Sequence, residues 1–174
     1  TITWNWEATH YYLTTDATPS SGGTVTPPSG WHTAGSNVEV QATANSGYEF
    51  TGWSGAITGT TNPDNVTIDG PKEVTGMFGD LAELEVTSTY GSPDPDVGTS
   101  TYSAGEQVTA TVTSPVEVDG VRYTCTGWSG TGDVEPSGTG TSTTFTLNQD
   151  STITWNWEAT HYYLTTDATP SSGG

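Results

Sequence analysis

Positive charge is the scarcest feature of this sequence. Its 174 residues include two Lys or Arg side chains against 20 Asp or Glu, which gives a formal net charge of −18 at pH 7. Such a chain repels phosphate backbones and anionic lipid headgroups, so the attraction on which nucleic-acid binding depends is missing. The charge balance therefore argues against nucleic acid and anionic membranes as partners. Acidity of this kind is common in extracellular and in salt-adapted proteins.

Cysteine and long apolar runs are also almost missing. Cys125 is the only cysteine, which excludes an intramolecular disulfide framework and leaves folding to depend on packing. We expect its thiol to be a buried apolar group rather than a reactive or intermolecular one. Because no run of about 18 apolar residues occurs, we expect no membrane insertion within this segment.

A helical periodicity is missing as well. No window places apolar residues at i, i+3, i+4 and i+7 over three turns, whereas Val38–Ala42 and Val108–Val112 alternate with the period of two typical of a half-buried strand. The 22 Gly and 10 Pro supply turn signals at short intervals. These patterns predict an all-β chain.

What the sequence does contain is repetition. Residues 1–23 and 152–174 are identical, which gives a period of 151 residues. We interpret the chain as one complete period and the start of the next, taken from a tandem array of nearly identical copies.

A weaker duplication lies inside this period. The tetrapeptide Gly52-Trp53-Ser54-Gly55 recurs as Gly127-Trp128-Ser129-Gly130, and the flanking positions then align. The alignment predicts residues 1–8 as the final strand of a preceding module, 9–79 as a first β module, 80–158 as a second, and 159–174 as the start of the next copy of the first.

Positions that stay apolar in both modules are best explained as core, because modules of this size are near the lower limit for an independent core. The structural core predicted in this way includes Trp53, Phe50, Phe78 and Val74 in the first module and Trp128, Trp157 and Ile153 in the second.

The order of motifs in the first module resembles that of a known family. A Gly22-Gly23 turn, the segment Trp31–Gly35, Tyr48-Glu49-Phe50 before the tetrapeptide, Asn62-Pro63 and finally Val66–Phe78 follow one another. This module is similar to the divergent internalin B-type repeat family of bacterial surface proteins. The second module looks like a more diverged member, with Asn148–Ser151 in place of Asp69–Lys72. The resemblance implies small β-grasp-related modules in tandem on secreted or surface proteins, without catalysis.

Both junctions between modules are short. Phe78–Leu84 and Trp157–Leu164 contain no flexible Gly/Ser linker, so we expect modules packed end to end in an elongated rod. At the junction, Trp155 is extra relative to Gly76. We expect it to cap its own core; packing on Tyr162 or Tyr163 and a sugar platform are the alternatives. Neighbouring copies are the expected partners, head to tail, and strands at the chain ends could also add to another chain.

Catalytic machinery is not apparent. His10, its copy His161, and His32 stand in no catalytic motif. We therefore expect no enzyme, no catalytic residue and no cofactor. Asp94 and Asp96 are weak candidates for a Ca²⁺ site, because alternating carboxylates in a turn are typical calcium ligands; a solvated acidic turn is the other interpretation.

Two functions are compatible with these features. The leading hypothesis is a non-catalytic structural repeat of an extracellular stalk, fibre or filament of a bacterial-type surface protein. The alternative is a repeated adhesin or carbohydrate-binding module that acts by avidity on cell-surface glycans. Exposed aromatic side chains such as Trp31, Tyr90 or Tyr102 would then bind the sugar.

Overall fold

The computed structural model describes residues 1–166, and the predicted all-β class is confirmed for them. No helix occurs in this part of the chain, and hence none that could cross a membrane. The β-grasp relationship that the resemblance implies stays a prediction.

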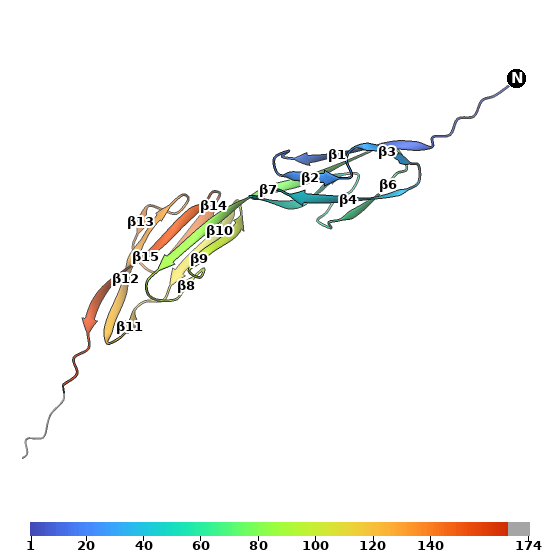
Figure 1. Cartoon of the computed structure of the whole chain (residues 1–174). Helices are drawn as coiled ribbons and strands as arrows, with labels where there is room; N and C mark the ends of the chain where they lie inside the picture. Colours follow the sequence, from blue (N-terminus) through green and yellow to red (C-terminus); the bar gives the residue numbers. More distant parts are fainter. Residues whose placement is uncertain (167–174) are drawn as a thin grey trace, which may run out of the picture. The chain divides into compact units, whose positions relative to one another are not determined.

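The chain divides into two compact units, Thr1–Leu81 and a second that begins at Ala82 (Figure 1). The first unit contains β1 (His10–Thr18), β2 (Gly23–Thr26), β3 (Gly30–Thr33), β4 (Asn37–Ala44), β5 (Tyr48–Gly55), β6 (Asp64–Thr67) and the first half of β7 (Lys72–Ser88). Strands β3, β1, β7 and β5 form one sheet, and β2, β4 and β6 form the other. The first strand and the last, β1 and β7, are parallel from Leu13↔Lys72 to Thr18↔Met77.

The core of the first unit lies between these two sheets. In β4, Val40 and Ala42 are buried while Glu39 and Gln41 are exposed, as the alternation of a half-buried strand requires. The same cluster includes Trp53, Phe78, Val74 and Ile68, and Phe50 packs against it. Burial of a side chain such as Leu13 stabilises the unit by about 1.5–3 kcal/mol.

The second unit repeats this plan. It contains the rest of β7, then β8 (Pro93–Asp94), β9 (Gly98–Ser103), β10 (Glu106–Val112), β11 (Val116–Val118), β12 (Val121–Thr131), β13 (Ser137–Gly138), β14 (Ser142–Leu147) and β15 (Ser151–Tyr162). Again the first and last strands are parallel, here from Leu84↔Ser151 to Ser88↔Trp155. Trp128 and Ile153 belong to its core cluster, and Trp157 packs against it.

Strand register identifies equivalent residues in the two units. Phe50 pairs with Phe78 as Cys125 pairs with Trp157. A register shift follows in both, at Gly52 and Gly127, whose φ angles are 148° and 134°. After the shift Trp53 lies opposite Gly76, whereas Trp128 lies opposite Trp155. Trp155 is buried, and its ring meets that of Trp128 edge to face at 5.8 Å.

The first half of β7 leads directly into the second half. Asp80 still pairs with Tyr48, and Leu81 N–H donates to Gly47 O at 2.8 Å. Glu83 N–H already donates to Asp150 Oδ1 at 2.9 Å, and Leu84 begins the pairing with β15. No loop therefore separates the last strand of the first unit from the first strand of the second. The predicted end-to-end rod stays a prediction.

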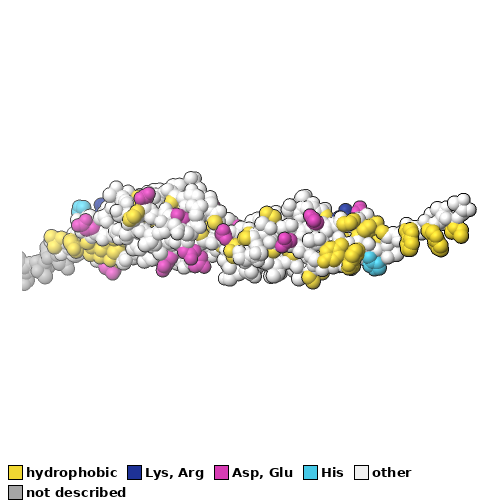
Figure 2. All heavy atoms as spheres, turned by 90° about the horizontal axis from the view of Figure 1, so that it is seen from above, with side chains coloured by type: hydrophobic (Ala, Val, Ile, Leu, Met, Phe, Trp, Pro, Cys, Tyr) yellow, Lys and Arg dark blue, Asp and Glu magenta, His cyan; other side chains and the backbone are white. Residues whose placement is uncertain are grey.

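The identical segments at the two ends of the chain have different surroundings. Residues 1–9 form no strand, and Ile2, Trp4 and Trp6 are 82%, 79% and 92% exposed. Figure 2 shows hydrophobic side chains along the N-terminal segment. In the second copy Ile153 and Trp155 lie in β15 and are 0% and 2% exposed. The predicted start of the next copy, 159–174, lies in β15 up to Tyr162, and its part 167–174 is outside the described residues.

Candidate functional site

The aromatic residues considered for sugar binding differ in exposure. Trp31 is 70% exposed and meets Tyr12, its partner across β1 and β3, edge to face at 5.4 Å. Tyr90 instead stacks on Tyr123 at 3.8 Å. Tyr102 packs against the core, and this partial burial raises the pKa of its hydroxyl. Only Trp31 among the three therefore presents most of its surface to solvent.

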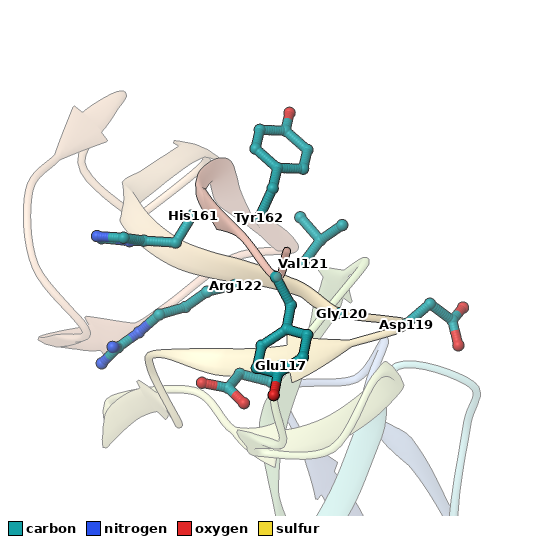
Figure 3. A pocket seen from close by; sticks show the side chains of 8 residues that line it. Glu117, Asp119, Gly120, Val121, Arg122, His161 and Tyr162 are labelled. Carbon is teal, nitrogen blue, oxygen red and sulfur yellow. The ribbon is translucent and has the colours of Figure 1, made fainter. Parts of the chain in front are cut away.

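A hollow lies at the end of the second unit (Figure 3). A cavity of about 240 Å³ is lined by Glu117, Asp119, Gly120, Val121, Arg122, His161, Tyr162 and Tyr163. Its wall is the hairpin of β11 and β12, whose turn residues Asp119 and Gly120 have φ angles of 49° and 74°. An Asp-Gly pair favours this two-residue turn because both central residues need positive φ.

Strand alternation sorts the cavity side chains onto two faces. Arg122 pairs with His161, and both extend to one side in Figure 3; Val121 pairs with Tyr162 and lies on the other. Glu117 pairs with Arg122 in the adjacent strand, so carboxylate, guanidinium and imidazole share one face. Arg122 is the only arginine of the sequence. The face can offer hydrogen-bond donors and acceptors to a surface placed against it.

The acidic turn proposed for Ca²⁺ is solvent-exposed. Asp94 forms the two-residue strand β8 with Pro93 and pairs with Thr111, and Asp96 follows in the loop; both carboxylates are exposed. Within residues 1–166, no three His, Cys, Asp or Glu side chains cluster as a metal site would require.

One acidic side chain outside the predicted sites, Asp133, organises a turn. Asp133 Oδ2 accepts hydrogen bonds from the N–H groups of Asn148 at 2.6 Å and Gln149 at 3.0 Å, and Oδ1 accepts from Gln149 Nε2 at 3.1 Å. The bond from Asn148 is the main reason why the pKa of Asp133 lies below its usual value. Its role here is to hold the turn between β14 and β15.

The lone thiol and the indole groups of the core have contrasting surroundings. Cys125 is buried, with Sγ 3.4 Å from Gly127 O. Trp53 Nε1–H donates to Thr61 O at 2.7 Å. No described residue accepts a hydrogen bond from the buried Nε1–H of Trp128 or of Trp155.

A known protein family matches the first unit. Residues 13–80 match the family model of the divergent InlB B-repeat domain. No curated protein and no solved structure matches the chain. The matched range runs from Leu13, the first buried residue of β1, to Asp80, the last residue of β7 that pairs with β5. The resemblance predicted for the first module is thus confirmed: residues 13–80 are similar to the divergent InlB B-repeat domain.

Proposed function

We propose that this chain is a repeating segment of an extracellular stalk or filament of a bacterial-type surface protein, and that it carries no catalytic activity. The InlB B-repeat family is found in bacterial surface proteins, which supports a cell-surface location. The sequence period of 151 residues supports an array of such segments.

The observation that carries this proposal is the continuity of β7. Two residues, Ala82 and Glu83, lie between Leu81, which is hydrogen-bonded to Gly47, and Leu84, which is paired with Ser151. A connection of this length has few free dihedral angles, because the strand hydrogen bonds fix those on either side of it. A chain of modules joined in this way is suited to span a distance and to transmit force, rather than to enclose a substrate.

Small-angle X-ray scattering on chains of one, two and three periods tests the proposal. We expect the maximum dimension to grow by a constant increment for each period while the cross-section stays the same. A matched control carries a Gly/Ser linker of about ten residues between Leu81 and Ala82, which should behave as a flexible coil. If the natural chains and the linker chains scatter alike, the stalk function fails.

The adhesin function remains a second candidate because one aromatic pair is exposed. Tyr12 and Trp31 offer an edge-to-face surface on the first unit. Aromatic faces of this kind can stack on sugars, and many copies would add avidity. Binding to a glycan array should disappear in Trp31→Ala and persist in Val97→Ala, which alters another exposed apolar residue. Absence of binding to any glycan by a chain of several periods would remove this candidate.

We propose that the fold needs no cofactor, and calcium is the ion to test. Asp94 and Asp96 are exposed, so a cation there would gain little over its hydrated state. The melting temperature should be the same in millimolar Ca²⁺ and in excess chelator, because only a ligand that binds the folded state preferentially raises it. A calcium-dependent rise that disappears in Asp94→Asn would instead establish the site.

A further inference from the structure

The tripeptide His-Tyr-Tyr occurs twice in the chain, and its two copies have different partners. We call it the shared tripeptide; it comprises residues 10–12 and 161–163. In the first unit it pairs with β3, from His10↔Thr33 to Tyr12↔Trp31. In the second unit it pairs with β12, through His161↔Arg122 and Tyr162↔Val121. In a tandem array, one tripeptide would belong to both units at once.

The hydrogen bonds of the two copies point to opposite edges of the strand. Thr9 O accepts a hydrogen bond from Ala34 N–H at 2.9 Å. Backbone groups alternate along an antiparallel strand, so those of Tyr11 point towards β3 and those of Tyr12 point away. Tyr163, the copy of Tyr12, donates its N–H to Gly120 O at 2.7 Å. Pairing with β3 and pairing with β12 therefore use different backbone groups of the tripeptide.

Both edges are also open at this position. The pairing of β1 with β7 begins at Leu13, one residue after the shared tripeptide, so it leaves the edge for β12 uncovered. The pairing of β15 with β7 covers Ser151 to Trp155 and ends before the tripeptide, so it leaves the edge for β3 uncovered. Both strands can therefore pair with one tripeptide without displacing β7.

We infer that wherever one period follows another, β12, the shared tripeptide and β3 of the following copy form one continuous three-stranded sheet. The partner of the cavity end of the second unit is thus the first module of the next copy of this chain. This inference rests on the proposed tandem array, and it specifies how successive periods join. It competes with the adhesin candidate, because the junction would cover Trp31 in every copy that follows another.

Tyr163 is the side chain that would contact both sides of this junction. Alternation places Tyr163 on the same face as His161, the face that also carries Arg122 and Glu117. Tyr163 lines the cavity, and a Cβ at Gly120 would lie 3.5 Å from its Cβ. Its copy Tyr12 holds Trp31 edge to face. Tyr163 would then contact the β11–β12 hairpin on one side and Trp31 of the next copy on the other.

A chain of two periods, labelled with 5-fluorotryptophan, tests the junction by ¹⁹F NMR. Trp31 of the first copy has no second unit before it and serves as the internal control; Trp31→Phe in each copy assigns the two signals. We expect Trp31 of the second copy to lose most of its solvent isotope shift, while the first keeps it. The amide of Tyr162 should exchange at least about tenfold more slowly than in the 174-residue chain. Equal shifts and equal exchange would overturn the inference.

A second substitution makes the test directional. Trp31→Ala in the second copy should speed amide exchange in the preceding hairpin, residues 117–122, whereas the same change in the first copy should leave that hairpin unaffected. The alanine variant could unfold its module. Trp31→Phe keeps an aromatic ring and is the second variant for that case, and it should preserve the protection of the hairpin amides from exchange. The maximum dimension measured by scattering could grow by a constant increment per period while Trp31 is equally exposed in both copies. In that case the proposed junction is wrong and the stalk function stands. Compact scattering would contradict the stalk itself.

Discussion

At the scale of the residue, the two tryptophans of the repeated tetrapeptide differ in one hydrogen bond. Trp53 donates to Thr61 O, and Trp128 finds no acceptor among the described residues. Phenylalanine removes the same volume from both, but at position 53 it also leaves a carbonyl without its donor. We expect Trp53→Phe to destabilise its unit by about 1 kcal/mol more than Trp128→Phe does. Urea unfolding followed by NMR signals of each unit measures this, and equal losses would contradict it.

A second residue, Asp133, ties stability to pH. Because its folded-state pKa is lowered, its contribution is present above the unfolded pKa of about 3.9 and is lost as pH falls through the folded value. Asp133→Asn should weaken the second unit at pH 7, and its difference from the parent should shrink as the pH falls below about 3.9. Thermal unfolding across this range tests the expectation. Glu135→Gln, in the same loop, is the control and should follow the parent; a loss that is independent of pH would refute the electrostatic explanation.

At the scale of the element, the register shift beside each tetrapeptide depends on glycine. A Cβ at Gly127 would lie 1.9 Å from Gly138 O, whereas at Gly52 the nearest atom, Gly59 O, would be 3.0 Å away. Both have positive φ, so Gly52→Ala should cost about 1–3 kcal/mol from backbone strain. Gly127→Ala should cost more, because β13 must also move.

Chemical denaturation of the two variants measures this difference. Gly70→Ala is the matched control, since a Cβ there meets no atom within 4 Å. A cost for Gly127→Ala no larger than that for Gly52→Ala would show that strand β13 yields readily.

The strands could be predicted because their signals are local. Alternation identified β4 and β10, and the repeated tetrapeptide aligned positions that the strand register then placed opposite equivalent partners, as with Phe50 and Cys125. The role of Asp133 could not be predicted, because its partners Asn148 and Gln149 come from a distant turn. Parallel pairing of β1 with β7 is equally non-local. The cavity could not be predicted either, because it depends on where the β11–β12 hairpin ends relative to β15. The pattern within a single strand does not encode that position.

At the scale of the whole molecule, the parallel pairing of first and last strands governs the response to force. In the first unit a pull on the start of β1 and on the end of its β7 partner acts in opposite directions along one ladder. The single-molecule unfolding force should therefore exceed that measured when the same unit is pulled across the antiparallel pair β4 and β6, at Asn37 and Thr67. Equal forces would contradict this geometry.

The parallel pairing of first and last strands also determines how an array would unfold under load. Shear distributes the load over all the hydrogen bonds of the β1–β7 ladder, from Leu13↔Lys72 to Thr18↔Met77, instead of on one bond at a time. The ladder between β7 and β15 is loaded in the same way. Each unit would then stay folded up to a threshold force and unfold in one step above it. The released chain would lower the tension, so the neighbouring units would stay folded until the tension rises again.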